Sequence, residues 1–204
     1  MIGIVDYGLG NVGAFETIFR RLGLPAKRAR TPDDLATSER LILPGVGAFD
    51  WAMGKLNRSG MRAMLDRRVL EDKVPVLGVC VGMQIMAEQS DEGNSAGLGW
   101  IKGHVERFRS SWFQHKTHLP HMGWNTVSPK AAEPTFKGID DPQYYFLHSY
   151  FFKPADPDHI IAHAHYGIEF AAAVRSKNIV ATQFHPEKSH DWGIGLLKNF
   201  AMSA

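Results

Sequence analysis

The chain has 204 residues, of which 44% are hydrophobic and 22% charged, with a formal net charge of +2. These values fit a globular protein, and we predict a single domain over residues 1–204. The small net charge argues against binding to nucleic acid or to an anionic membrane surface. No apolar stretch approaches the roughly 18 residues of a membrane span. A single cysteine excludes an internal disulfide and favours a reducing compartment, so we expect a cytoplasmic protein.

Short apolar runs and helical patterns alternate along the chain. Strands that are apolar throughout and alternate with helices are typical of a parallel sheet covered on both faces. The middle of the chain, from about 101 to 152, is richer in aromatic residues and in short alternating runs, which predicts a smaller antiparallel portion. We therefore predict an α/β fold with three layers and a mostly parallel central sheet. The expected strands are 2–5, 40–43, 74–79, 160–164, 171–174 and 179–184, and the expected helices are about 15–22, 49–70, 81–87 and 193–202.

The first glycine-rich turn is a competing signal for nucleotide binding. Residues 8–13 match the pattern G-x-G-x-x-G between an expected strand and an expected helix, as a dinucleotide site requires. The acidic residue expected about 20 positions later is missing. Lys27, Arg28 and Arg30 stand there instead and would suit NADP. The alternative is a tight turn in which glycines relieve steric conflict.

Cys80 is the candidate nucleophile. Gly78 and Gly82 flank it at the junction of an expected strand and helix, in the form of a nucleophile elbow. Such a turn exposes the nucleophile above the edge of the sheet in a strained backbone conformation. The positive end of the helix dipole favours a thiolate there, and the amide of Val81 can stabilise an oxyanion. A lone cysteine in an apolar strand can instead be a small buried hydrophobic residue.

His185 and Glu187 are the candidate base and the group that orients it. They follow the expected strand 179–184. Because the carboxyl ends of parallel strands share one edge of a sheet, His185 is expected to meet Cys80 there. Glu187 can accept the ring proton of His185 from the same side. The alternative for His185 is a histidine at a strand end that is hydrogen-bonded to the backbone.

Six motifs stand in order along the chain: DYGLGN at 6–11, PGVGAF at 44–49, CVGMQ at 80–84, PHMGWN at 120–125, FLHSY at 146–150 and FHPEKS at 184–189. Together they resemble the motifs of the class I (triad-type) glutamine amidotransferases. More specifically, the chain resembles the glutaminase subunit of imidazole glycerol phosphate synthase, over essentially its whole length. The resemblance implies a flavodoxin-like sheet, and it reassigns the first glycine-rich turn to the family's own opening loop.

The resemblance implies a reaction and a set of site residues. Cys80, His185 and Glu187 would hydrolyse glutamine to glutamate and ammonia through a thioester, with no cofactor. We expect no metal either, because the histidines lack ligand spacing. The residues implied for the oxyanion site are Gly45, Val46, Gly47 and Val81, and those implied for glutamine binding are Gln84, Glu92, His148, Ser149 and Tyr150.

The family also implies a partner, which receives the ammonia through an internal tunnel. The expected partner is a synthase subunit with a (β/α)₈ barrel, a cyclase that forms a heterodimer with the glutaminase. The residues implied for this interface are Pro120, His121, Trp124 and Lys188. Ordinary aromatic packing is the alternative for Trp124.

Two departures from the family pattern leave the ammonia acceptor open. Val81 replaces a leucine that usually follows the nucleophile, and residues 110–119 are less typical. The acceptor reaction can belong to histidine biosynthesis or to the amination of a sugar for surface polysaccharides. Two further alternatives are a catalytically silent regulatory subunit on the same fold and a cysteine hydrolase of related fold.

Overall fold

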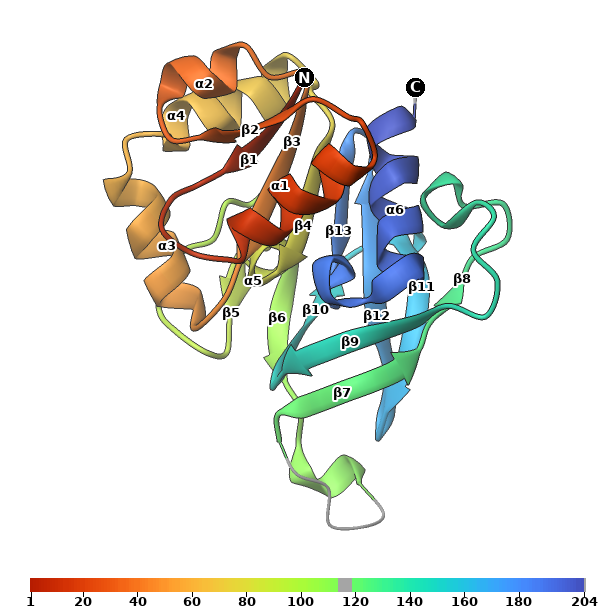
Figure 1. The fold of residues 1–204 in the computed structure, drawn as a ribbon. Helices are drawn as coiled ribbons and strands as arrows, with labels where there is room; N and C mark the ends of the chain where they lie inside the picture. The colour runs from red at the N-terminus through yellow and green to blue at the C-terminus, as the bar shows by residue number, and fades with distance from the viewer. Residues whose placement is uncertain (114–118, 204) are drawn as a thin grey trace.

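An eight-stranded sheet forms the centre of the molecule in a computed structural model that describes residues 1–113 and 119–203 (Figure 1). In spatial order the strands are β2 (Ala26–Ala29), β1 (Ile2–Val5), β3 (Arg40–Gly45), β4 (Val76–Cys80), β13 (Ile179–Thr182), β12 (Ile168–Ser176), β11 (Ile160–Tyr166) and β8 (Ser128–Pro129). The first five strands in this order, from β2 to β13, pair in parallel. Strands β12, β11 and β8 continue the sheet with antiparallel pairing.

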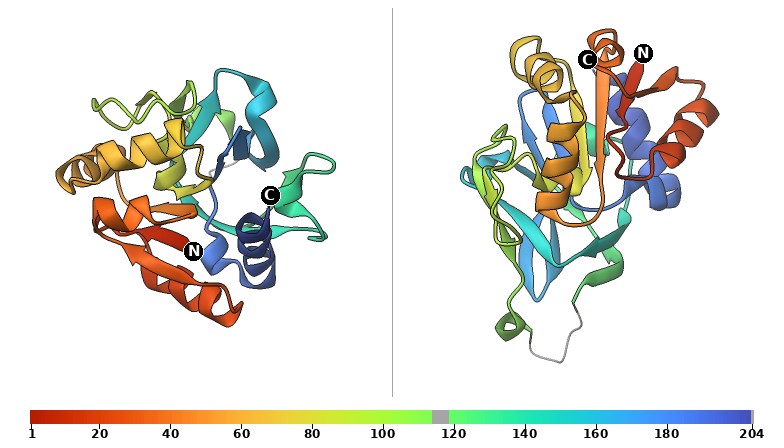
Figure 2. Two further views of the ribbon diagram at one scale, coloured as in Figure 1. Left: turned by 90° about the horizontal axis from the view of Figure 1, so that it is seen from above. Right: turned by 90° about the vertical axis from the view of Figure 1, so that its left-hand side faces the viewer.

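Helices cover both faces of this sheet. Helices α1 and α6 lie on one face, and α3 and α4 lie on the other (Figures 1 and 2). Strands β1 and β4 are buried along their whole length, as their uninterrupted apolar sequences require. The predicted three-layer α/β fold is therefore confirmed. The α-helices are α1 (Val12–Arg21), α2 (Pro32–Ala36), α3 (Phe49–Arg58), α4 (Arg62–Asp66), α5 (Val81–Gln84) and α6 (His190–Met202).

Two smaller sheets account for the aromatic middle of the chain. Both contain the antiparallel pairing that the alternating sequence predicts. The first consists of β10 (Tyr150–Pro154), β6 (Gly103–Arg107) and β5 (Gln89–Ser90), and the second of β7 (His121–Thr126) and β9 (Gln143–His148). A π-helical turn covers Arg67–Glu71, and 3₁₀ turns cover Ser110–Trp112, Pro134–Phe136, Pro157–His159 and Pro186–Lys188.

Two predicted helices are shorter in the structure. The expected helix 49–70 is interrupted after Arg58, because Gly60 adopts a left-handed conformation with φ +73°. The expected helix 81–87 ends at Gln84. The carbonyl oxygens of Ile85, Met86 and Ala87 instead accept hydrogen bonds from amides of the segment 98–101. Part of the atypical stretch 110–119 lies outside the described residues.

Candidate active site

Cys80 occupies a strained turn between β4 and α5. Its backbone has φ +55° and ψ −113°, which a residue with a side chain rarely adopts. A Cβ atom on Gly82 would overlap the carbonyl oxygen of Leu43 in β3, so only glycine lets the two segments approach this closely. The thiol is 3% exposed. Because α5 has only four residues, the thiol gains little from a helix dipole.

His185 reaches the same edge of the sheet from the neighbouring strand. Strand β13 pairs in parallel with β4, with Thr182 opposite Val79, so both chains leave the sheet side by side. The backbone amide of His185 donates to the carbonyl oxygen of Tyr145 at 2.9 Å. The Nδ1 atom of His185 lies 2.8 Å from Oε1 of Glu187, and both side chains are 3% exposed. The Nε2 atom is therefore the ring nitrogen left to face Cys80.

The pKa of His185 reflects a competition between burial and its two partners. Burial lowers this pKa, but the hydrogen bonds and the charges of Cys80 and Glu187 outweigh burial and raise the pKa to about 10. The imidazole is therefore a strong proton acceptor beside the sulfur. This is the arrangement that activates a cysteine nucleophile.

Gln183 is a neighbour of the sulfur that the sequence reasoning missed. It is fully buried, and its Nε2 atom lies 3.8 Å from the sulfur of Cys80. Gln84 donates from its Nε2 atom to Oε1 of Gln183 and to the carbonyl oxygen of Tyr150, both at 3.0 Å. The available signal was a polar residue directly after the apolar strand β13. Gln84 and Gln183 thus hold the wall of the site together behind the nucleophile.

A cavity of about 300 Å³ opens above Cys80. It brings together most of the residues that the sequence analysis assigned to the oxyanion site and to glutamine. Gly45 lies beneath it in β3, close to the backbone of Gly82, and Glu187 lies behind His185. The predicted residues that line the cavity are Val46, Gly47, Cys80, Val81, Gln84, Glu92, Pro120, His148, Ser149, Tyr150, His185 and Lys188.

Tyr7 braces the strand that carries the predicted oxyanion segment. Its hydroxyl donates to the carbonyl oxygen of Pro44 at 2.8 Å. Burial, and then the charge of Cys80, raise the pKa of Tyr7 above its ordinary value. The hydroxyl therefore keeps its proton, and the bond holds the start of the Gly45–Gly47 segment. In the sequence alone, Tyr7 stands out only as part of the motif at 6–11.

A pair of neutral histidines, His148 in the cavity lining and His121 next to it, supports one wall of the cavity. Burial lowers the pKa of His121 to about 4, and burial with its ring neighbours lowers that of His148 to about 3. His148 Nδ1 donates to the carbonyl oxygen of Tyr150 at 2.8 Å, so its Nε2 must accept from Nδ1 of His121 at 2.9 Å. His121, expected at a partner surface, is thus 4% exposed, and it stacks on Tyr166.

The other three residues expected at a partner surface lie in or near the open side of the site. Pro120 and Lys188 line the cavity. Trp124 is 46% exposed on β7 and stacks on His190 with ring centroids 5.3 Å apart. Met122, on the same strand, is 66% exposed. His121 is therefore buried, whereas the other three residues expected at a partner surface, Pro120, Trp124 and Lys188, are exposed.

The first glycine-rich turn packs against this site. A Cβ atom on Gly10 would approach the ring of Pro44 to 2.6 Å, so the turn lies directly against the segment that carries Gly45. Arg28 pairs with Glu16 at 2.7 Å and Arg30 with Asp6 at 2.9 Å. The basic residues that suggested NADP therefore already bind carboxylates of this chain.

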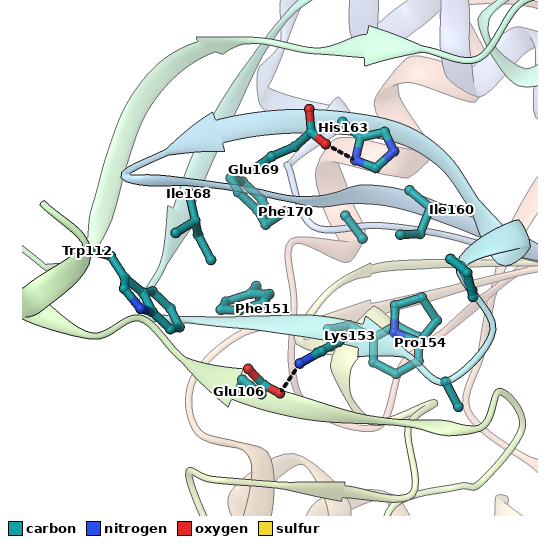
Figure 3. Close-up of a pocket in the computed structure, with 14 residues that line it drawn as sticks. Glu106, Trp112, Phe151, Lys153, Pro154, Ile160, His163, Ile168, Glu169 and Phe170 are labelled. Atoms are coloured by element: carbon teal, nitrogen blue, oxygen red, sulfur yellow. Dashed lines mark hydrogen bonds and ion pairs between the residues drawn. The ribbon is translucent and has the colours of Figure 1, made fainter.

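A second hollow of about 530 Å³ lies between β10 and the hairpin of β11 and β12 (Figure 3). Aromatic and aliphatic side chains form most of its lining. Lys153 and Glu106 form an ion pair at 3.0 Å, and the Nδ1 atom of His163 lies 3.4 Å from Oε1 of Glu169 (Figure 3). None of the predicted catalytic residues lines this hollow.

Two other kinds of site are absent from the described residues. Within residues 1–113 and 119–203, no group of three or more His, Cys, Asp or Glu residues is arranged to hold a metal ion. Over the same described residues, no helix has both the length and the apolar character needed to cross a bilayer.

Comparison with known proteins shows the family to which the chain belongs. The family model of the class-I glutamine amidotransferases matches residues 4–204. The imidazole glycerol phosphate synthase subunit HisH of Bdellovibrio bacteriovorus is 54% identical over 202 residues, which covers 98% of this chain and 99% of that protein. The subunit HisH 2 of Pseudomonas aeruginosa is 44% identical over 201 residues, with 98% of each chain covered.

A solved structure agrees with the fold. A crystal structure of a glutamine amidotransferase superposes with a TM-score of 0.75 over 98% of both chains, at 20% sequence identity. At this identity the similarity concerns the arrangement of helices and strands. Because the family model spans nearly the whole sequence and two relatives exceed 40% identity along it, the chain belongs to the class-I glutamine amidotransferases.

Proposed function

We propose that this protein is the glutaminase subunit of an imidazole glycerol phosphate synthase. It hydrolyses glutamine and passes the ammonia to a synthase subunit, in histidine biosynthesis. The HisH relatives at 54% and 44% identity support the subunit and the pathway. The convergence of Cys80, His185 and Glu187 at one cavity is the observation that supports the chemistry.

The proposed reaction has two halves. His185 takes the proton of the Cys80 thiol, and the sulfur attacks the side-chain amide carbon of glutamine. The tetrahedral intermediate collapses to a thioester when ammonia leaves with the proton that His185 returns. A water molecule, deprotonated by His185, then attacks the thioester and releases glutamate and the thiol. Glu187 orients the ring and stabilises the imidazolium throughout.

The oxyanion of each tetrahedral intermediate is stabilised by backbone amides. We assign this role to Val81 and to the Gly45–Gly47 segment, where Gly47 has φ +89°. Glycine lets a peptide in this segment turn toward a developing charge. Loss of one such donor costs about 2.7–4 kcal/mol of transition-state stabilisation. Tyr7 limits how far the start of the segment can move.

The glutamine itself occupies the cavity in this proposal. Glu92 binds the α-ammonium group of the substrate, and the backbone of His148, Ser149 and Tyr150 forms another part of the cavity wall. Gln84 also lines the cavity, and because its amide nitrogen donates to Gln183 and Tyr150, it holds this wall in place. The pair of neutral histidines keeps the His148 segment in place without adding a charge near the substrate.

The synthase subunit docks on the β7–β9 face in this proposal. Met122, Trp124 and Leu147 are exposed apolar residues on these two strands, and such a patch is typical of a protein interface. Pro120, directly before β7, and Lys188, over the ring of Tyr145 in β9, both line the cavity. The partner is a (β/α)₈ barrel cyclase that forms a heterodimer and receives the ammonia directly. A free nucleophilic thiol suits the reducing cytoplasm, where we place the complex.

The test compares the wild-type protein with Cys80→Ala, each in complex with the synthase subunit that co-purifies with it. Glutamate release from glutamine is expected to be lost in Cys80→Ala. Turnover of the same complex with added ammonium should persist, which shows that the variant is folded and bound. Equal glutamate release by both proteins would overturn the proposed mechanism.

The same preparation separates the alternatives. A partner that uses ammonia only to aminate a sugar would replace histidine biosynthesis with the surface-polysaccharide pathway. A wild-type complex that releases no glutamate, although it stimulates its partner, would indicate a silent regulatory subunit. Cleavage of a peptide without glutaminase activity would indicate a cysteine hydrolase of another kind.

A further inference from the structure

The loop that carries Glu92 is fastened to the first turn of α3. Both oxygens of the Asp50 carboxylate accept backbone hydrogen bonds from this loop. The amide of Asn94 donates to Oδ2 at 3.0 Å, and the amide of Ser95 donates to Oδ1 at 2.9 Å. These bonds hold the pKa of Asp50 below its ordinary value, so the carboxylate is ionised at neutral pH. A charged acceptor makes both bonds stronger than bonds between neutral groups.

Gly93 is the residue that lets Asp50 come this close. A Cβ atom at Gly93 would overlap the carboxylate of Asp50. The two backbone hydrogen bonds of Asp50 therefore depend on position 93 having no side chain. Any larger residue at 93 would push the carboxylate out of the loop.

Glu92 is placed by the same turn of the helix. Its Oε2 atom accepts a hydrogen bond from the backbone amide of Phe49 at 2.8 Å, directly before Asp50. Glu92 also lines the cavity above Cys80. A carboxylate has two oxygens, so Glu92 can hold the helix with one and accept from a ligand's ammonium group with the other. The position of Glu92 in the cavity thus depends on how the loop meets α3.

We propose that Asp50 is a positioning residue for glutamine: its carboxylate fastens residues 94 and 95 so that Glu92 keeps its place on the cavity wall. The inference rests on the proposed glutaminase function and extends it to a residue that touches neither the substrate nor the nucleophile. Because Asp50 acts before the chemical step, its loss weakens substrate binding. It leaves the attack by Cys80 unchanged.

The experiment measures KM and kcat for glutamine in the complex with the synthase subunit. Asp50→Ala is expected to raise KM about tenfold and to change kcat by less than about twofold. Gly93→Ala should raise KM in the same way, because its Cβ displaces the carboxylate. The matched control is Asp33→Ala, an acidic residue at the same place in the first turn of α2 and outside the cavity lining. This control should leave KM unchanged.

A double substitution distinguishes positioning from a general loss of structure. In a Glu92→Ala background, Asp50→Ala should raise KM by less than about twofold more, because the residue that it positions is already absent. Amide hydrogen exchange provides a readout independent of activity. The amides of Asn94 and Ser95 should exchange faster in Asp50→Ala, whereas those of β4 should not change.

Three outcomes decide the matter. An unchanged KM in Asp50→Ala, with glutamine hydrolysis still dependent on Cys80, overturns this inference and leaves the proposed function standing. A full, additive effect of Asp50→Ala in the Glu92→Ala background also overturns it. Failure of the wild-type complex to hydrolyse glutamine refutes the proposed function, and the inference falls with it.

Discussion

Replacing Glu187 with glutamine is expected to slow the proposed glutamine hydrolysis while leaving the imidazole of His185 in place. The carboxylate and the ring of His185 are in contact at 2.8 Å, and both side chains are almost completely buried. Glutamine has nearly the same shape, and its amide oxygen can still accept from Nδ1 of His185. The substitution therefore removes the negative charge beside the ring and little else.

The size of the effect follows from the pKa of His185. Burial lowers this pKa, and Cys80 and Glu187 together raise it to about 10. An opposite charge at this distance is worth about 1–3 pH units, and each unit corresponds to about 1.4 kcal/mol. The imidazolium that forms during attack is thus destabilised by about 1.4–4 kcal/mol. The expected fall in kcat is about 10- to 1000-fold.

The pH dependence gives the sign of the effect independently of its size. Because Glu187 favours the protonated ring, its neutral replacement lets His185 lose its proton at a lower pH. The alkaline limb of the activity profile should therefore move to lower pH in Glu187→Gln.

The assay is glutamate release by the complex between about pH 6 and pH 10, with Glu169→Gln as the matched control. Glu169 also pairs with a histidine, His163, but it is 70% exposed and lies outside the cavity. An unchanged kcat and an unmoved alkaline limb in Glu187→Gln would refute the reasoning.

Two further predictions concern stability. Gly82→Ala is expected to destabilise the fold by about 3 kcal/mol or more, because the added Cβ overlaps the backbone carbonyl of Leu43 in a central strand. The control is Gly54→Ala inside α3, where the added Cβ meets only a flexible side chain. This variant should be neutral or more stable than the wild type by up to about 1 kcal/mol. Equal urea midpoints for the two variants would contradict the close approach of Gly82 to Leu43. The pKa values of His121 and His148, about 4 and about 3, lie below the ordinary value of 6.5. As the pH falls below 6.5, the unfolded chain takes up these protons first, so the free energy of unfolding should fall by up to about 1.4 kcal/mol per pH unit for each ring. Urea unfolding at about pH 7 and pH 5 measures this loss, and equal stability would show that the rings are not held neutral.

The chemistry was predictable because its determinants are local. A cysteine between two glycines at the end of an apolar strand specifies a strained turn, whatever surrounds it. His185 and Glu187 lie two residues apart, so their contact depends on a short segment. The meeting of Cys80 and His185 is a long-range contact, but the rule that parallel strands end at one edge made it predictable. Strands β4 and β13 are in fact neighbours.

The length of the helices was less predictable, because periodicity does not show where other segments compete for the backbone. The apolar pattern continues to residue 87, yet α5 stops at Gln84. The next carbonyl groups are taken by amides of the segment 98–101, more than ten residues further along the chain. Gly60 was a visible signal for the break after α3, but an isolated glycine inside a helical pattern does not by itself end a helix.

Side-chain periodicity, turn chemistry and short motifs encode the class of fold, the candidate nucleophile and the candidate base and acid. The polar groups that surround these residues became visible only once the packed chain was known. Gln183 beside the sulfur, Tyr7 on the strand of Gly45 and Asp50 on the loop of Glu92 each join segments at least 37 residues apart. His121 was expected at a partner surface but is buried in the structure, for the same reason. Such contacts depend on where whole strands and loops pack, and no local pattern records that.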